Sequence, residues 1–393
     1  MERKEQTMSQ TLSAVKFIRN NKRQVFVVIS ALSLAFMAMY VIQFILMVTE
    51  ESFRPVMLEQ PKKITFAYLS GESLGLTWND DMTEESYQEQ YQKKMDDLME
   101  ELRAQDGIKE CYYTQLLGVS YVPVIGNWWY TFPMLEAEQI PDYLKYMDAK
   151  LVEGRLPERD GEVLLDQKVM MNHDYRIGDY FLEGSYGKIF TIVGTLQSDS
   201  MVCAGTPNGY TNVGWALTVL HEESRADFRE VMRSLGKTVA EEDTIDDAVR
   251  NKKNYESDVA ETIESAISVI LVVVVIFLAI AVFVTYISFM RNRVGEWCLY
   301  ISIGYSRKEI YGLIMREVLI LFGTSMAVGC ILSAVMMVIL AKILIVPKGL
   351  SFGFWYPAHF LRLCASYVFL IGMLQIPICI IINKIQTIDQ VED

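Results

Sequence analysis

The chain alternates between long apolar runs and a highly charged middle section. Four windows contain no Asp, Glu, Lys or Arg: 24–49, 265–290, 318–341 and 363–383. A bilayer core about 30 Å thick needs about 20 apolar residues in helical form, so each window predicts a membrane-spanning helix. The first run exceeds the roughly 7–15 apolar residues of a signal peptide and no small-x-small cleavage pattern follows it. It is therefore predicted to stay as an anchor.

The section between the first two runs has mixed periodicities. Strand patterns occur at 62–70, 111–126, 162–166 and 189–196, and the segment 83–105 has a helical pattern. A further helical pattern at about 225–265 leads directly into the second apolar run. We therefore expect a membrane α-helical fold with four transmembrane helices and a mixed α+β extracytoplasmic domain inserted between helices 1 and 2.

These patterns divide the chain into four parts. We expect a cytoplasmic amphipathic helix over 1–23 and the first transmembrane helix over 24–49. The extracytoplasmic domain with its helical stalk follows over 50–262, and the remaining membrane region, with helices 2–4, over 263–393. In the third run, small residues four apart, Gly323 with Ala327 and Gly329 with Ser333, permit close helix packing, within one chain or between two.

Charge distribution predicts the orientation. Among 393 residues, 49 are acidic and 36 basic, a net charge of −13. Residues 50–260 alone hold 39 acidic and 21 basic side chains. Basic residues gather before the first run and between the second and third, which places these segments and both termini in the cytoplasm. An outward-facing domain with a net charge of −18 excludes a nucleic-acid partner.

The sequence predicts no catalytic residue and no metal site. Ser73 lies in a Gly-x-Ser-x-Gly pattern, but an acidic, turn-like loop follows it where a hydrolase needs a helix. The three histidines are far apart and no Cys-x-x-Cys is present. Cys111 and Cys203 fall in the extracytoplasmic domain, either as one disulfide or as two buried thiols.

Two motifs carry a resemblance to a known family. In the stretch from 151 to 196, a series of turn and strand-pairing residues resembles the extracytoplasmic core domain of the MacB/LolE class of ABC transporter permeases. Its members are Gly154, Arg155, Pro157, Glu162, Gly178, Asp179, Phe190, Val193 and Gly194. Glycine suits sharp turns and proline fixes φ, so the motif is expected to hold the fold together.

The second motif follows the second apolar run. The stretch 296–317 resembles the signature of the FtsX-like permease domain, with Ile301 and Tyr305 departing from the family pattern. The resemblance implies an ATPase-coupling segment, with a docking helix around 302–311 and the following coupling residues: Glu296, Gly304, Tyr305, Ser306, Arg307, Lys308, Ile310 and Glu317. Gly304 is expected to let the chain turn sharply between helices. A loop that merely sets topology is the alternative interpretation.

Together the motifs resemble the MacB/LolE/FtsX-like superfamily of mechanotransmission (type VII) ABC transporter permeases. The resemblance implies a non-catalytic permease subunit in the bacterial cell membrane, with a MacB-type core domain over 50–262 and an FtsX-like permease domain over 263–393. No phosphate-binding loop is present, so ATP and Mg²⁺ are expected on a partner ATPase rather than on this chain. Other expected partners are membrane lipid and a second permease, as a copy or a homologue.

The expected function is the export or expulsion of a peptide, antibiotic or lipid-linked substrate, powered by the partner ATPase. The acidic external domain favours a cationic antimicrobial peptide through long-range attraction. Two alternatives remain open: an FtsX-like activator of cell-wall hydrolases, and a peptide-sensing membrane module.

Overall fold

The computed structural model describes residues 19, 21–79, 82–181, 190–210, 213–291, 293–353 and 355–384. The predicted amphipathic helix at 1–23 lies mostly outside these residues. The described chain forms two compact units: residues 1–45, 265–341 and 353–393 belong to a helical unit, and residues 46–264 and 342–352 to a mixed α/β unit. We call the second the external unit, a name that refers to the orientation predicted from the charge distribution. Each unit is described by itself.

The helical unit is built from long apolar helices. They are α3 (Lys22–Arg54), α9 (Glu261–Arg291), α11 (Arg307–Leu340) and α12 (Pro357–Lys384), with the short α10 (Val294–Ser302) between α9 and α11. The outer ends of α3 and α9 belong to the external unit. Four helical stretches are long and apolar enough to cross a membrane, as predicted: Val25–Lys62, Ala248–Ser288, Arg307–Lys348 and Pro357–Asn383. Large apolar side chains such as Phe277, 70% exposed, cover their outside, as expected of a surface that faces lipid.

Contacts between α3, α11 and α12 involve small and aromatic residues. The Ser33 hydroxyl donates to the carbonyl of Ser325 at 2.9 Å, which ties α3 to α11. Tyr367 of α12 donates its hydroxyl to the Leu32 carbonyl of α3 at 2.5 Å, and its ring lies edge-on to Phe36. Buried polar groups joined in this way hold helices in one register where lipid offers no competing partner.

A larger side chain should affect protein stability at Gly329 but not at Gly323. An added Cβ at Gly329 would lie 2.9 Å from the Phe36 side chain, whereas one at Gly323 meets nothing within 4 Å. We expect Gly329→Leu to lower the thermal stability of the purified chain, with an overpacking cost of about 1–3 kcal/mol. Gly323→Leu is the matched control on the same helix and should leave stability unchanged. Equal losses in both variants, measured by thermal aggregation in detergent, would contradict packing within the chain.

The external unit contains two β-sheets. The first has the strand order β10-β1-β9-β2-β3 and is antiparallel throughout; the second has the order β4-β7-β5-β8, with β6 paired to β7 and a parallel pair β5–β7. The strands of the first sheet are β1 (Ile64–Tyr68), β2 (Ile108–Tyr121), β3 (Trp128–Pro133), β9 (Gly214–His221) and β10 (Thr244–Asp246). Those of the second are β4 (Lys150–Gly154), β5 (Glu162–Asp166), β6 (Tyr180–Phe181), β7 (Phe190–Gln197) and β8 (Ala204–Gly205).

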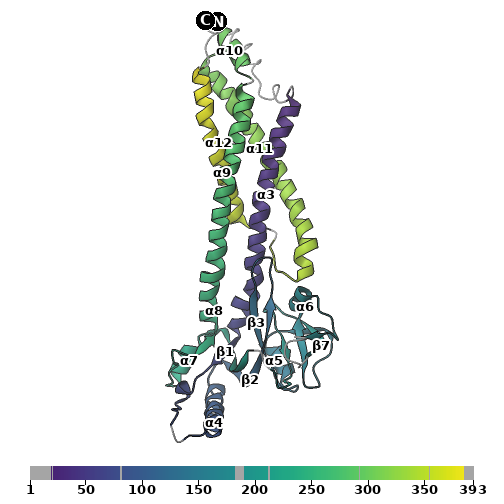
Figure 1. Ribbon diagram of the computed structural model, residues 1–393, viewed down its shortest axis with the longest axis vertical. Coiled ribbons are helices and arrows are strands. Elements are labelled where there is room, and N and C mark those ends of the chain that lie inside the picture. Colours follow the sequence, from purple (N-terminus) through teal and green to yellow (C-terminus); the bar gives the residue numbers. More distant parts are fainter. Residues whose placement is uncertain are drawn as a thin grey trace. The chain divides into compact units, whose positions relative to one another are not determined.

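Helices lie between the strands of these sheets along the chain, and one follows the last strand (Figure 1). They are α4 (Glu84–Arg103), α5 (Ile140–Tyr146), α6 (Gln167–His173), α7 (Phe228–Ser234) and α8 (Ala248–Asn254). Single turns of 3-10 helix form η2 (Gln60–Lys62), η3 (Glu72–Leu74), η4 (Glu223–Arg225) and η7 (Val346–Lys348), and π-helical turns form η1 (Pro55–Glu59), η5 (Tyr255–Ala260) and η6 (Ala341–Ile345). One core joins α4 and α7 to the first sheet through Met95, Leu98 and Phe228. A second core, around Leu116, Tyr143 and Leu164, joins α5 to both sheets.

The fold class predicted from the sequence is confirmed: four candidate membrane helices, with a mixed α/β unit between the first two. The predicted strands at 62–70, 162–166 and 189–196 and the helix at 83–105 correspond to β1, β5, β7 and α4. Two alternatives were open for Cys111 and Cys203, one disulfide or two buried thiols. In the structure they are two buried free thiols.

Candidate functional site

The segment between α9 and α11 is a sharp helical corner. Helix α10 ends at Ser302 and α11 begins at Arg307. Gly304 has φ +104°, a conformation that side chains with a Cβ rarely adopt. Its N–H donates to the Ile301 carbonyl and the N–H of Tyr305 to that of Tyr300, at 2.9 and 3.0 Å, the bond pair of a Schellman motif. The prediction of one docking helix around 302–311 is wrong, since this turn divides it.

Ser306 begins the next helix with a capping box. Its hydroxyl accepts the N–H of Glu309 at 3.3 Å, and the Glu309 carboxylate accepts the Ser306 N–H at 2.7 Å. This reciprocal pairing satisfies donors that the first helical turn leaves unpaired. The sequence Gly304–Tyr305–Ser306 therefore fixes both helix ends, and Ile310, which is fully buried, anchors the first turn of α11.

The corner exposes both basic and apolar side chains. Arg307 and Lys308 are exposed at the start of α11, and Leu299 and Ile303 are 50% and 57% exposed at the end of α10. We call Leu299, Ile303, Arg307 and Lys308 the corner surface. Its two apolar members, Leu299 and Ile303, were not among the residues predicted from the sequence. Their four-residue spacing places them on one helix face and could have revealed them.

A buried ion pair fastens α10 to α11. Both guanidinium end nitrogens of Arg293 bind the carboxylate of Glu317, at 2.5 and 3.2 Å, and the two side chains are only 7% and 1% exposed. The guanidinium carbon also lies 5.4 Å from the ring centre of Trp297, which is fully buried. Two-point pairing requires the guanidinium of arginine, and the cation–π contact with Trp297 holds this group further, so Arg293 has a fixed geometry.

Arg293 was not among the sequence-predicted site residues. Its environment joins two of them, because its Nε also donates to the exposed carboxylate of Glu296 at 3.3 Å. Of the predicted coupling residues, Glu296 and Glu317 thus meet at Arg293, while Gly304, Tyr305, Ser306, Arg307, Lys308 and Ile310 form the corner itself. Arginines near the ends of membrane spans are common, so the position of Arg293 in the sequence did not by itself indicate a functional role.

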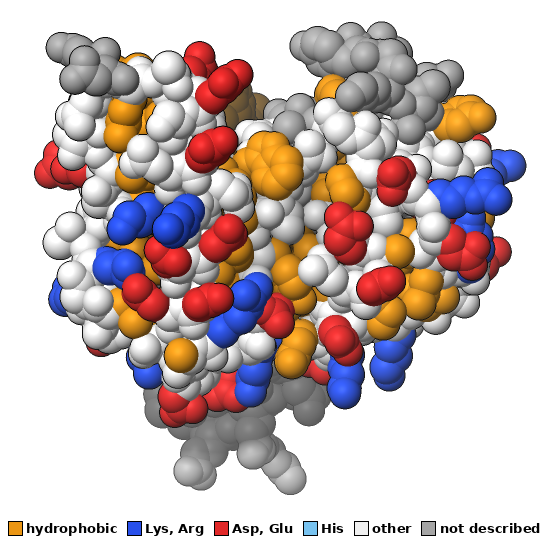
Figure 2. Space-filling view, turned by 90° about the horizontal axis from the view of Figure 1, so that it is seen from below, with side chains coloured by type: hydrophobic (Ala, Val, Ile, Leu, Met, Phe, Trp, Pro, Cys, Tyr) orange, Lys and Arg blue, Asp and Glu red, His pale blue; other side chains and the backbone are white. Residues whose placement is uncertain are grey.

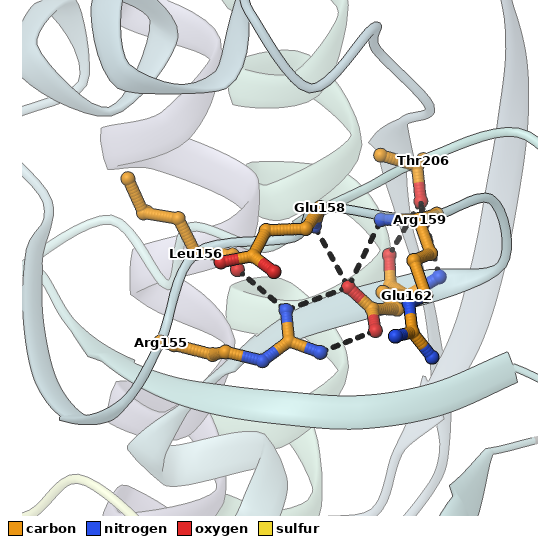
Figure 3. A network of polar contacts seen from close by, with 6 residues as sticks. All are labelled: Arg155, Leu156, Glu158, Arg159, Glu162 and Thr206. Carbon is orange, nitrogen blue, oxygen red and sulfur yellow. Dashed lines mark hydrogen bonds and ion pairs between the residues drawn. The ribbon is translucent and has the colours of Figure 1, made fainter.

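The predicted motif of the external unit forms a second cluster, around Glu162 (Figure 3). Arg155 donates to both carboxylate oxygens of Glu162, at 2.8 and 2.5 Å. The same carboxylate accepts the backbone N–H of Glu158 at 2.8 Å and of Arg159 at 3.2 Å. Glu162 therefore closes the loop that leads from β4 to β5, and buried Pro157 lies within this loop. This is a structural role.

The glycines of this motif allow the backbones of β4 and β7 to approach each other closely. Gly154 pairs with Gly194 across β4 and β7, and an added Cβ at Gly154, where φ is +85°, would lie 2.2 Å from the Val193 carbonyl oxygen. Gly178 also has positive φ, +94°, but faces open space. Asp179 follows it and accepts the Arg176 N–H at 2.8 Å, which closes a turn before β6.

The two ends of β5 carry carboxylates with opposite pKa shifts. Hydrogen bonds from Arg155 lower the pKa of Glu162 to about 2. Burial raises the pKa of Asp166 to about 6, although Asp166 accepts the Lys168 N–H and the Ser198 hydroxyl. Glu162 therefore stabilises the fold when ionised, whereas the buried charge of Asp166 opposes folding at neutral pH.

These shifts predict a pH dependence of stability. Because the folded-state pKa of Glu162 is depressed, its contribution is present above about pH 4.5 and is lost as the pH falls toward 2. Because that of Asp166 is raised, protonation between about pH 6 and 4 is stabilising. We expect Glu162→Gln to reduce the loss of stability at acidic pH. Asp166→Asn should remove the gain in stability that the wild type shows below pH 6. Tryptophan fluorescence during thermal unfolding in nanodiscs tests both. If the stability of both variants changed with pH as that of the wild type does, the pKa shifts of Glu162 and Asp166 would be contradicted.

Other sequence features have structural partners. The Ser73 hydroxyl donates to Asp243 at 2.5 Å and accepts the Ala240 N–H at 2.7 Å, so it joins two loops. Among the described residues no group of three or more His, Cys, Asp or Glu side chains is arranged to hold a metal ion. On the face shown in Figure 2, acidic and basic side chains are interspersed with hydrophobic ones.

One family model matches a part of the chain that includes the corner. Residues 268–388 match the family described as FtsX-like permease C-terminal. None of the curated proteins compared with the chain matches it significantly. The solved structures that it is similar to include the periplasmic region of MacB from Actinobacillus actinomycetemcomitans, at 16% identity over 53% of this chain and 97% of the other, with a TM-score of 0.26.

Two further solved structures are similar to the chain. The extracellular domain of the noncanonic ABC-type transporter YknZ from Gram-positive bacteria shares 13% identity over 47% of this chain and 98% of the other, with a TM-score of 0.26. A domain of a putative permease from Porphyromonas gingivalis shares 14% identity over 36% and 72%, with a TM-score of 0.20.

Residues 268–388 of this chain are therefore similar to the C-terminal part of FtsX-like permeases, the family that the sequence resemblance of the second motif indicated. This match and the four helical stretches that are long and apolar enough to cross a membrane indicate a membrane protein.

Proposed function

We propose that this chain is the permease subunit of an ABC transporter in a bacterial cell membrane and that the corner surface docks on a cytoplasmic ATPase. ATP and Mg²⁺ are bound by that partner. The observation that carries the proposal is the combination, on an FtsX-like domain, of exposed apolar and basic side chains on a corner fixed by the buried Arg293–Glu317 pair. Apolar anchors beside charged groups are typical of protein docking sites.

The proposed output is movement of the external unit. Helical residues are continuous from Ala248 to Ser288, through the π-helical turn η5. A rigid helix that begins near the corner and ends in the external unit would transmit a rotation produced when ATP closes the ATPase. We propose that two permease subunits work together and that the movement expels a peptide, antibiotic or lipid-linked substrate.

The orientation follows from the basic residues. With both termini and the corner surface in the cytoplasm, Arg307 and Lys308 face the ATPase and the external unit lies outside. A cationic antimicrobial peptide is one candidate substrate, favoured by the acidic charge of residues 50–260. On the face shown in Figure 2 the two signs are interspersed, so that face offers no single acidic patch to such a peptide.

The docking proposal predicts a charge-reversal result. The tagged chain, purified in mild detergent from its native host, should bring an ABC ATPase with it. Arg307→Glu/Lys308→Glu should lose that ATPase while the chain still inserts, because a docking surface that meets an acidic or polar partner tolerates like charge poorly. Lys252→Glu/Lys253→Glu, an equally exposed basic pair of the external unit, is the matched control and should retain the ATPase.

The other outcomes distinguish the rival functions. If no ATPase accompanies the wild-type chain under conditions that preserve other ABC complexes, the proposal fails. Co-purification of a cell-wall hydrolase would favour an activator of such enzymes, and co-purification of a kinase without an ATPase would favour a peptide-sensing module.

A further inference from the structure

The end of the β2–β3 hairpin is an exposed apolar loop. We call residues 122–127 the hairpin tip. Val122 is 38% and Ile125 is 52% exposed, and Trp129, just beyond the tip, is 51% exposed. Between Glu110 and Glu136 the sequence contains no Asp, Glu, Lys or Arg, although residues 50–260 carry 60 such side chains, 39 acidic and 21 basic. An uncharged, exposed apolar loop in so charged a domain requires a physical reason.

Next to the tip, Trp128 contacts the segment that follows the first charge-free run. The rings of Phe53 and Trp128 lie edge to face with centres 6.1 Å apart. An added Cβ at Gly126 would be 3.8 Å from the ring of Phe53. Phe53 is three residues beyond Glu50, where the first charge-free run ends, a rise of about 4.5 Å along a helix.

The other side of the tip is joined to the link between the third and fourth spans. The Asn172 amide bonds both backbone groups of Val122, accepting at 2.9 Å and donating at 2.8 Å, and donates to the Lys348 carbonyl at 3.1 Å. Tyr121 donates its hydroxyl to the Gly349 carbonyl at 3.0 Å. This link follows the charge-free run that ends before Lys342.

Two independent attachments thus hold the hairpin tip beside chain segments that leave a bilayer within a few residues. All these contacts lie inside the external unit. At the depth of Glu50 and Lys342 the surroundings are lipid headgroups, where tryptophan and short apolar side chains are favoured and unpaired acidic groups are not.

We propose that the hairpin tip inserts into the headgroup region of the leaflet next to the external unit, with Ile125 as its leading side chain and phospholipid as its partner. A second copy of the chain is the main alternative occupant. The absence of charge from residues 122–129, where the exposed apolar side chains lie, favours lipid, because a protein rim would ordinarily carry polar and charged groups. The tip would brace the external unit against the membrane while its helices move.

Photo-crosslinking from single positions tests this proposal. p-Benzoylphenylalanine would replace Ile125 in the full chain, reconstituted in nanodiscs of phosphatidylcholine and phosphatidylglycerol, and mass spectrometry would identify the adducts. Phe277, exposed in a candidate span, is the positive control, and Gln92, exposed on α4, is the negative control.

Lipid adducts at position 125 comparable with those at 277, and none above background at 92, are the expected result. A protein adduct at 125, whether to a second copy or to another chain, would overturn the proposal. So would the absence of a lipid adduct at 125 when position 277 gives one. Because the readout reports the neighbour directly, it does not depend on ATPase binding.

Discussion

Replacing Glu317 with leucine is expected to destabilise the helical unit by about 3–5 kcal/mol, the cost of leaving a buried charge without its partner. Arg293 is 7% exposed and would lose both bonds to the Glu317 carboxylate. The temperature at which half of the detergent-solubilised protein leaves the monodisperse fraction should fall strongly. Size-exclusion chromatography after heating measures it.

Two controls identify the cause. Glu296→Leu removes the exposed partner of the same arginine and should cost less than about 1 kcal/mol. The double variant Arg293→Met/Glu317→Leu removes both charges and should regain most of the stability, since apolar side chains of similar volume replace buried ion pairs well. A stable Glu317→Leu single variant would refute the structural role of the pair.

The substitution Gly154→Ala is expected to have the largest effect in the external unit. A left-handed backbone costs a residue with a Cβ roughly 1–2 kcal/mol, and overpacking adds about 1–3 kcal/mol. Both apply at Gly154, where the new Cβ would lie 2.2 Å from the Val193 carbonyl oxygen and 2.6 Å from the Gly194 Cα. Neither neighbour is a flexible side chain that can move aside.

Gly178→Ala isolates the first of these costs. Its φ is +94°, yet the added Cβ meets nothing within 4 Å. Thermal unfolding in nanodiscs, followed by tryptophan fluorescence, should rank wild type, Gly178→Ala and Gly154→Ala in order of falling stability. Equal losses in the two variants would show that backbone strain alone matters and that the close strand approach does not.

The membrane helices were predictable because their signal is one-dimensional. A bilayer requires about 20 uncharged apolar residues in sequence, and the four charge-free runs meet this requirement without any knowledge of tertiary contacts. Strands β1, β5 and β7 were found for a similar reason: each is a short apolar run bounded by turn residues.

The corner shows where local signals compete. A docking helix around 302–311 was predicted together with a sharp turn at Gly304, and one continuous helix over this range could not contain that turn. In the structure, the capping box of Ser306 with Glu309 and the positive φ of Gly304 end one helix and begin another. Both signals are present in the sequence, but only their joint geometry shows that they belong to one turn.

The sequence by itself determined the four spans, the inserted α/β domain and the family resemblance, because hydrophobic runs, strand periodicity and turn residues act over a few neighbouring positions. Only the tertiary structure decided that Arg293 joins Glu296 to Glu317 and that Gly154 lies against the Val193 carbonyl. It also decided that Trp128 packs on Phe53 and that Asn172 links the hairpin tip to Lys348. These contacts join residues that chain folding brings together, and their energies depend on distance and burial, which have no expression in the order of residues along the chain.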